Sequence, residues 1–364
     1  MKRIAVRLPN PIGDVVAATP LLRLLRQRNP LARILAVGTR PAVELLQGLP
    51  TVDEFAELPG EARRGLLAPW HEARVLRQLF ADTVYLLPNS FSSALAAFLA
   101  GVPDRIGRRG SGRSPLLTET LPAVRQARPM TELYVELDGA SEAPPIELSV
   151  TEREARLCSE TLEALSGYDI GPPFLAVAPG AAFGPSKIYP AEMTAAAVLR
   201  IHERSGLQPL LFGSPAEAAL CREIKERCQE GGVRAPFMHA SIGEMKALLP
   251  HCRVLLTMDN GARHVAAALG VPQVVLFGAT DPAWTDYCRA RTTFLRREEV
   301  ECSPCHKKEC PIDLRCLRRI EPEVVAEAVD KAAQLQLERE RLAAEAAADA
   351  AAPPPAGPGS PPLA

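Results

Sequence analysis

The stretch that most constrains the fold of this chain is residues 254–282, in which two apolar runs flank a short helical pattern. Residues 254–258 form a continuous apolar run typical of a buried strand, and the turn sequence Asp-Asn-Gly at 259–261 follows it. Residues 262–269 then have helical spacing, which stops at Gly270. The stretch therefore predicts a strand, a turn, a helix, a second strand and a loop.

The turn at 259–261 has two interpretations. A helix that begins at the carboxyl end of a strand leaves its first amides unpaired at the positive end of its dipole, where phosphate binds well. The amides of Asn260 and Gly261 are therefore candidates for binding phosphate. In the alternative interpretation, Asp259 only caps the helix and Gly261 eases the turn.

Strand and helix patterns alternate along both halves of the chain. Strands are predicted at 3–8, 32–38, 83–87, 174–178 and 209–212. Helices are predicted at 14–28, with a kink or restart at Pro20, and at 69–80, 91–100, 151–165 and 190–204. Two capping-box sequences, Ser214 to Glu217 and Ser241 to Glu244, open further helices. This alternation predicts parallel sheets with helices on both faces.

The pattern dissolves around residues 137–145, and we predict the linker between the domains at about residues 142–173, with the helix 151–165 attached to either side. We therefore expect an α/β fold with two doubly wound, Rossmann-like domains at 1–160 and 161–335. Residues 336–364 are predicted to be a helical extension and a Pro-rich disordered tail. The loops at 9–14, 180–187 and 259–261 all follow predicted strands, and open α/β sheets bind ligands at the carboxyl ends of their strands.

Composition limits the class of protein. A chain of 364 residues with 47% hydrophobic residues can fill about two cores. The formal net charge of -1 argues against nucleic acid as the main partner. We find neither a bilayer-spanning apolar run nor a signal peptide, because Arg7, Asn10 and Asp14 interrupt the N-terminal apolar stretch. We expect a cytoplasmic enzyme with reduced cysteines.

Two charged residues stand out in the strand-following loops. Asp14 is either the N-cap of the first long helix or a carboxylate that accepts the proton of an attacking hydroxyl. Lys187 ends a loop rich in Gly and Pro, and it is either solvated or placed to stabilise a diphosphate leaving group without a metal. His264 is either a half-buried packing residue or a group that points into a ligand-binding cleft between the two domains.

Several segments, in the same order along the chain, resemble the lipopolysaccharide heptosyltransferases of glycosyltransferase family nine. They are RLPNPIGDVVAATPLLRLLR at 7–26, LPNSFSSALAAFLAGVPDRIG at 87–107, PGAAFGPSKIYPAE at 179–192, and DNG, His264, AAALGVP and FGATDP within 259–282. Their wording is closest to the heptosyltransferase II branch. The chain differs from the residues usual in this branch at Pro11, Ile188-Tyr189, Asn260 and Ala279. These differences bear on the fine specificity for substrates more than on the chemistry.

The resemblance implies a GT-B fold and an inverting transfer of L-glycero-D-manno-heptose from ADP-heptose to a heptosyl-Kdo2-lipid A inner core. It implies that Asp14 is the general base and that Lys187 binds the donor phosphates. The predicted donor site comprises Gly180, Lys187, Asp259, Asn260, Gly261 and His264. No cofactor is expected, and the enzyme should contact the inner face of the cytoplasmic membrane as a peripheral protein.

The acceptor site is predicted in the first domain. Its candidate residues are Asn10, Gly13, Arg105, Arg108, Arg109 and Arg113. The four arginines fall in DRIGRRGSGR at 104–113, which the sequence predicts to be a turn-rich loop. Their mutual repulsion would be relieved by the phosphate and carboxylate groups of an acceptor. The alternative is an ordinary solvated basic loop.

A cysteine cluster near the C-terminus is a candidate metal site. Its residues are Cys302, Cys305, Cys310 and Cys316, four of nine cysteines. The spacing lacks the second close pair of a zinc ribbon, so zinc or another metal stands beside a reduced structural or redox-labile cluster as alternatives.

Two alternatives to the proposed transferase remain. One is a family-nine transferase with a different nucleotide sugar or acceptor, which product analysis would distinguish. The other is a catalytically silent sugar-nucleotide-binding protein, which would not need Asp14 as a base.

Overall fold

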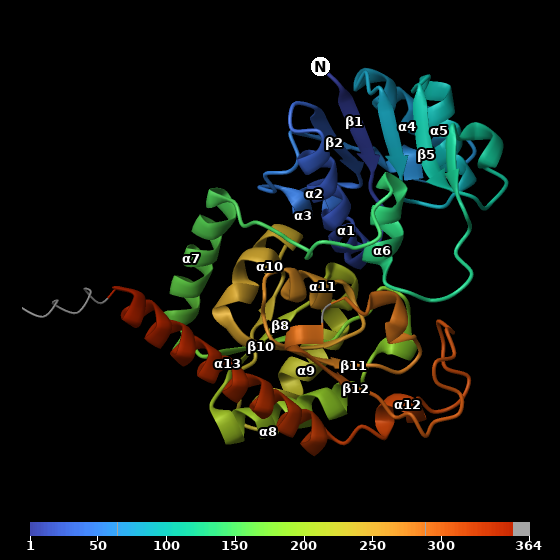
Figure 1. Ribbon diagram of the computed structural model, residues 1–364. Coiled ribbons are helices and arrows are strands. Elements are labelled where there is room, and N and C mark those ends of the chain that lie inside the picture. The colour runs from blue at the N-terminus through green and yellow to red at the C-terminus, as the bar shows by residue number, and fades with distance from the viewer. Residues whose placement is uncertain (64, 288, 352–364) are drawn as a thin grey trace, which may run out of the picture.

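The computed structural model describes residues 1–63, 65–287 and 289–351. These residues form two α/β domains, which lie one above the other in Figure 1. The first domain contains a parallel sheet of six strands in the order β3-β2-β1-β4-β5-β6. Its strands are β1 Arg3–Arg7, β2 Arg33–Gly38, β3 Glu54–Glu57, β4 Thr83–Leu86, β5 Asp104–Arg108 and β6 Glu119–Leu121. Its helices are α1 Ile12–Ala17, α2 Thr19–Arg28, α3 Arg40–Leu46, α4 Ala68–Gln78, α5 Phe91–Ala100 and α6 Met130–Val135.

The second domain repeats this topology, with the strand order β12-β11-β10-β7-β8-β9. Its strands are β7 Phe174–Ala178, β8 Gln208–Phe212, β9 Phe237–Met238, β10 Cys252–Met258, β11 Gln273–Leu276 and β12 Thr292–Leu295. Its helices are α7 Glu152–Ser166, α8 Ala191–Ser205, α9 Ala218–Glu230, α10 Ile242–Leu248, α11 Gly261–Ala268, α12 Arg315–Arg318 and α13 Pro322–Ala351. Each sheet reverses its winding between two adjacent parallel strands, β1 and β4 or β7 and β10, where ligands bind in such folds.

The predicted fold class is therefore confirmed, whereas some local predictions were wrong. The predicted restart near Pro20 is confirmed, because α1 ends at Ala17 and α2 begins at Thr19. Asp14 is however not an N-cap, because Pro11 precedes the first residue of α1. Residues 104–108 are not part of a loop but form strand β5, paired with β4 and β6. The predicted capping boxes are present at Ser214 and Ser241.

Contacts between the domains place the two sheets in a fixed relation. Helix α10 of the second domain packs against α3 of the first and against α7. The fully buried side chain of Lys246 donates hydrogen bonds to the carbonyls of Leu45 at 3.2 Å and Gln47 at 3.0 Å, and it pairs with Glu154 at 3.0 Å. A buried ammonium needs such partners, so the contact is specific.

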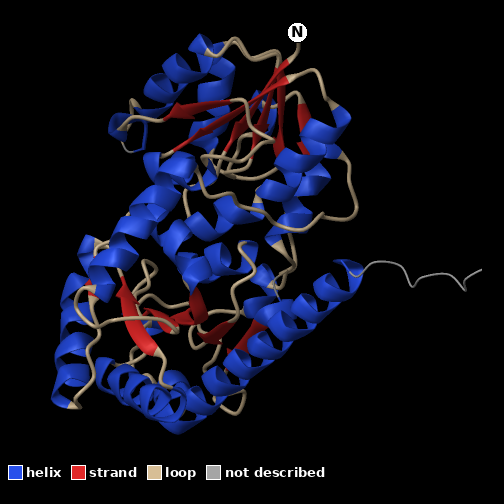
Figure 2. Ribbon diagram, turned by 90° about the vertical axis from the view of Figure 1, so that its left-hand side faces the viewer, coloured by secondary structure: helices blue, strands red, loops and turns tan. Residues whose placement is uncertain are grey.

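Helix α13 runs along the outside of the second domain, and Figure 2 shows its length from the side. Its buried residues Val325, Ala326 and Val329 join the core that the second sheet shares with α8. The predicted boundaries at 160 and 335 fall within α7 and α13, and they stay predictions. The predicted disordered tail at 352–364 lies outside the described residues. Within the described chain, no helix has the length and apolarity needed to cross a membrane.

Candidate functional site

The three loops that the sequence marked come together where the domains meet. They follow β1, β7 and β10, and α1 of the first domain packs against α11 of the second. The approach is so close that a Cβ on Gly13 would lie 2.5 Å from Cδ2 of His264. A Cβ on Gly261 would lie 3.0 Å from Cβ of Ile12. Glycine at both positions therefore permits the contact that joins the two halves of the site.

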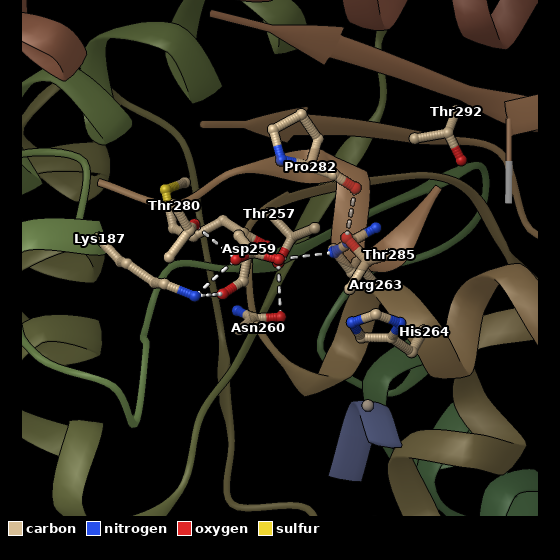
Figure 3. A network of polar contacts seen from close by, with 12 residues as sticks. Lys187, Thr257, Asp259, Asn260, Arg263, His264, Thr280, Pro282, Thr285 and Thr292 are labelled. Atoms are coloured by element: carbon tan, nitrogen blue, oxygen red, sulfur yellow. Dashed lines mark hydrogen bonds and ion pairs between the residues drawn. The ribbon is translucent and has the colours of Figure 1, made fainter. Parts of the chain in front are cut away.

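Asp259 is the centre of a hydrogen-bonded network at the end of β10 (Figure 3). Its carboxylate accepts hydrogen bonds from Lys187 Nζ at 2.5 Å, Arg263 Nε at 2.9 Å and Thr280 Oγ1 at 2.7 Å. Burial alone would raise the pKa of Asp259, but the charges of Arg263 and Lys187 and the hydrogen bonds hold it well below its usual value. Asp259 therefore stays ionised.

The start of α11 differs in part from the sequence prediction. The helix cap is Asn260 and not Asp259, because the Asn260 side chain accepts a hydrogen bond from the amide of Ala262 at 3.0 Å. The amide of Asn260 is also not free, since it donates to the carbonyl of Met258 at 2.8 Å. The Asn260 side chain in turn donates to the carbonyl of Gly180 at 2.7 Å, which ties two of the loops together.

Asp14 lies in the first turn of α1 and is partly buried. Burial, reinforced by the negative charge of Asp259, raises the pKa of Asp14 from 3.8 to about 6, while the positive charge of Lys187 opposes the shift. The two aspartates and the lysine are thus close enough to influence one another. A carboxylate with a pKa of about 6 is ionised at neutral pH and more basic than an ordinary aspartate.

His264 contacts both domains. It is 5% exposed, and its Nδ1 lies 2.6 Å from the hydroxyl of Tyr287, which also donates to the carbonyl of Gly13 at 3.4 Å. Burial, with the charge of Arg263, lowers the pKa of His264 well below 6.5, so the imidazole is neutral at neutral pH. Its position beside Gly13 makes it part of the domain contact.

Sequence reasoning missed several residues of this site. Arg263 is completely buried beneath Asp259, and its guanidinium lies over the rings of Phe277 and Phe294 at 5.3 and 5.8 Å. Thr280 and Tyr287 join the network through their hydroxyls. In the sequence Arg263 looks like one charge on a short helix, so no local signal marked its burial.

A hollow of about 230 Å³ opens beside this network. It lies at the carboxyl ends of β7, β8 and β10, and its walls include Gly180, Phe212, Glu217, Met245 and Gly261. The carboxylate of Glu217 comes so close to Gly180 that a Cβ there would lie 1.9 Å from Oε1. Sequence analysis identified Glu217 only as a capping-box residue. An apolar wall with a few fixed polar groups is suited to a small organic ligand.

The four predicted acceptor arginines have different environments. Arg113 is completely buried and donates to the carbonyl of Pro88 and, at 2.9 Å, to Oδ1 of Asn89. Arg108 is 6% exposed and pairs with Glu136. Arg105 donates to backbone carbonyls of its own domain. Repulsion within a solvated loop is therefore not a property of this cluster.

Arg109 is the exposed member of the four arginines. Asn10, the predicted acceptor residue in the loop after β1, is also exposed. Arg109 lines a wide surface hollow together with Arg108, Arg125 and Arg128. Arg125 and Arg128 did not belong to the predicted set. Glu136 also lines this hollow and pairs with Arg108 and Arg128, so the excess positive charge of the hollow lies at Arg109 and Arg125.

The structure brings the four predicted metal-candidate cysteines to one place. They are Cys302, Cys305, Cys310 and Cys316, which all line one hollow. Burial raises the pKa of the Cys316 thiol, and the charges of the other three cysteines raise it further. Among the described residues, however, no three Cys, His, Asp or Glu side chains are already grouped to hold a metal ion.

Two doubly wound domains with a shared site at the carboxyl ends of their strands define the chain as a two-domain α/β protein of the GT-B class. The profile of glycosyltransferase family 9 (heptosyltransferase) matches residues 70–315. The chain therefore belongs to glycosyltransferase family 9, and the protein is a glycosyltransferase.

Individual relatives agree with this assignment. The chain is 31% identical over 301 residues to lipopolysaccharide heptosyltransferase 2 of Escherichia coli K12, a match that covers 78% of this chain and 84% of that protein. The structure of E. coli ADP-heptose LPS heptosyltransferase II superposes with a TM-score of 0.75 at 28% identity, covering 93% of this chain and 100% of that one. A family 9 protein from Veillonella parvula shares the fold, with a TM-score of 0.77 at 20% identity over 92% and 97% of the chains.

Proposed function

We propose that this protein transfers L-glycero-D-manno-heptose from ADP-heptose to a heptosylated, lipid A-linked inner core. The observation that carries the proposal is the placement of Asp14, with its raised pKa, beside the Lys187–Asp259 pair where the domains meet. A base and a fixed positive charge close to one another are what a glycosyl transfer to an alcohol requires. The names of its relatives support the choice of sugar and acceptor.

In the proposed reaction Asp14 removes the proton of the acceptor hydroxyl as its oxygen attacks the anomeric carbon of the heptose. The bond to the ADP oxygen breaks on the opposite face, so the anomeric centre is inverted. Lys187 stabilises the negative charge that develops on the departing diphosphate, as a preorganised cation does in a water-poor site. Asp259 keeps Lys187 oriented in the absence of donor, and its carboxylate would bind hydroxyls of the donor sugar.

The nucleotide part of the donor would occupy the hollow beside Gly180 and Gly261. Its phosphates would then lie near the amide of Gly261, at the start of α11, and near Lys187. Glu217, whose Oε2 is bound by the backbone and hydroxyl of Ser214, would accept hydrogen bonds from the ribose hydroxyls through Oε1. His264 would support this arrangement from below through its contact with Gly13.

No cofactor is required in this proposal, because Lys187 supplies the positive charge that a metal supplies in other transferases. An ion at the four cysteines would have four protein ligands, and sites of this kind are structural.

The acceptor would approach from the first domain, past Asn10 and Gly13. Arg109 and Arg125, the exposed arginines of the wide surface hollow, would bind the phosphate and carboxylate groups of the inner core, since arginine recognises both in bidentate fashion. An acceptor anchored by lipid A lies at the inner face of the cytoplasmic membrane. We propose that the enzyme docks there reversibly as a peripheral protein.

The arginine hollow leads to a prediction about salt. Replacing the exposed residues Arg109 and Arg125 by Ala should raise the KM for the acceptor by roughly 5- to 30-fold at low salt, at about 1 kcal/mol per arginine. The salt dependence of KM should become flatter, because fewer charges are left to be screened. Steady-state kinetics against NaCl concentration measure both quantities.

The matched control is Arg222→Ala, which removes an exposed arginine from α9 of the second domain. It should change neither the KM for the acceptor nor the affinity for ADP. If the Arg109/Arg125 variant lost affinity for ADP and not for the acceptor, the hollow would belong to the donor half of the site.

The raised pKa of Asp14 leads to a prediction about pH. A base must be ionised to act, so kcat/KM should fall about tenfold per pH unit below a pKa of about 6, instead of below 3.8. The pH profile of kcat/KM, recorded over about two pH units on either side of this pKa, measures this limb. A rate that stays constant down to the bottom of this range would show that Asp14 is not the titrating base.

The decisive experiment is mass spectrometry of the products formed from ADP-heptose and inner-core lipids that end in one heptose. The expected product is the acceptor enlarged by one heptosyl unit, together with free ADP. ADP-heptose turnover with a different acceptor would favour another family 9 transferase. ADP binding without any turnover would indicate a silent nucleotide-binding protein.

A further inference from the structure

The cysteines of the described chain fall into two groups. Cys158, Cys221, Cys228 and Cys252 are buried in the cores of the two domains. The thiol cluster, as we name the other group, consists of Cys302, Cys305, Cys310 and Cys316. Its four residues surround one small hollow of about 70 Å³, although no regular element connects the first three. Core packing accounts for Cys316, which is buried in the core of the second domain, but not for the convergence of the other three thiols on it.

The backbone beside the thiol cluster has two residues in an uncommon conformation and one contact with a sulfur atom. His306, directly after Cys305, and Leu314 have positive φ angles of 55° and 57°, which are uncommon for residues other than glycine. The amide of Leu314 donates a hydrogen bond to Sγ of Cys310 at 3.4 Å. The loop therefore presents a backbone donor to a cysteine sulfur, and thiolate sulfur is the form of cysteine that binds metals.

We propose that the thiol cluster binds one thiolate-preferring metal ion, zinc in the expected case, with its four cysteines as ligands. The described side chains are not yet grouped to hold an ion, so binding would rotate the thiols toward the centre of the hollow. Each cysteine would release one proton to solvent, which leaves two negative charges on a complex of four thiolates with a divalent ion. Lys307 and Arg315 line the same hollow and would balance these charges.

The thiol cluster also holds the loop that carries Lys187. Ser186 donates hydrogen bonds from its hydroxyl to the carbonyl of Lys307 and from its amide to the carbonyl of Lys308, the latter at 3.1 Å. Gly184 packs so closely on this segment that a Cβ would lie 2.5 Å from the Lys308 carbonyl oxygen. A metal between Cys305 and Cys310 would therefore fix the segment that positions Lys187.

Metal analysis of the full-length protein, purified under reducing conditions and dialysed, tests the site without any substrate. Elemental analysis should find about one zinc or iron ion per chain. Co²⁺ added to chelator-treated protein should give the intense thiolate charge-transfer and visible bands of a tetrahedral sulfur site. The proposal is overturned if the protein retains no metal and Co²⁺ gives no such bands. It is equally overturned if a thiol titration finds the four cysteines joined in disulfides.

Variants assign the ligands. Cys305→Ser/Cys310→Ser should lose the metal, whereas Cys228→Ala, which alters a buried cysteine of the core, should retain it. Metal bound equally by both variants would contradict the assignment. Circular dichroism of the double variant and of the control shows whether the double variant folds. The Co²⁺ spectrum of the unaltered protein tests the metal site without any variant.

The effect on Lys187 rests on the proposed donor site. Removing the metal should weaken ADP binding by roughly 3- to 30-fold in calorimetry, the range of coupling between neighbouring networks, and Zn²⁺ should restore it. An ADP affinity that is the same with and without metal would overturn the coupling. Absence of ADP binding in the metal-loaded protein would instead count against the proposed function, and the metal content would still decide the site itself.

Discussion

Replacing Asp14 by Asn is expected to lower kcat by about 10²- to 10⁴-fold, the usual contribution of a general base, while the affinity for ADP stays unchanged. Asparagine has nearly the same shape but cannot accept the proton of the acceptor hydroxyl. Because Asp14 lies on α1 of the first domain and the proposed nucleotide hollow lies in the second, the nucleotide should not contact Asp14, and donor binding should be kept. Single-turnover kinetics with saturating donor and ADP calorimetry measure the two effects separately.

The same substitution should not destabilise the protein. The folded-state pKa of about 6 lies above the unfolded value of 3.8, so ionising Asp14 opposes folding by up to about 3 kcal/mol at pH 7 and above. Asn removes this cost, although it also removes a charge that favours the first turn of a helix. We expect a free energy of unfolding at pH 7.5 that equals or exceeds that of the unaltered protein.

Urea unfolding at several pH values checks this expectation. The unaltered protein takes up a proton at Asp14 as the pH falls from about 6 towards 4, so any advantage of the Asn variant should shrink over this range. Loss of the fold in Asp14→Asn, or full activity with it, would return Asp14 to a structural role in α1.

The sheet cores were predictable because their strands are continuous apolar runs. The predicted strand at 174–178 coincides with β7, whose five residues are all buried, and the run at 254–258 lies within β10. The outer strands were missed, since β3 and β9 are short and only partly buried, and they show neither an apolar run nor clear alternation. Their position depends on pairing with strands that are distant in sequence.

The candidate site could be predicted as three loops, but not as a network. Asp14, Lys187 and Asp259 each follow a strand, and parallel strands end at the same edge of a sheet, so their proximity follows from the topology. Arg263 and Tyr287 act through contacts between elements, which spacing along the chain does not reveal. For the same reason the sequence misjudged Arg113, two of whose acceptors lie 24 and 25 residues away in another loop.

Replacing Lys187 by Ala is expected to weaken ADP binding by about 5- to 150-fold, or roughly 1–3 kcal/mol, as for a lost charge-assisted contact. The Lys187 side chain is 12% exposed, so solvent screens its interaction with ADP only in part. The substitution also removes a positive charge that lowers the pKa of Asp14 and of Asp259. The acidic limb of kcat/KM should therefore move to higher pH.

Two further variants separate these effects. Lys187→Arg keeps the charge and should leave the acidic limb in place, even where a longer side chain costs some ADP affinity. A double-mutant cycle with Asp259→Asn measures the coupling energy between the two side chains in ADP binding. Because Lys187 and Asp259 are in direct contact at 2.5 Å, this coupling energy should be at least about 0.5 kcal/mol in magnitude. An ADP dissociation constant that is the same for Lys187→Ala and the unaltered protein would mean that Lys187 serves Asp259 alone, and the charge on the leaving group would then have to be stabilised by the start of α11.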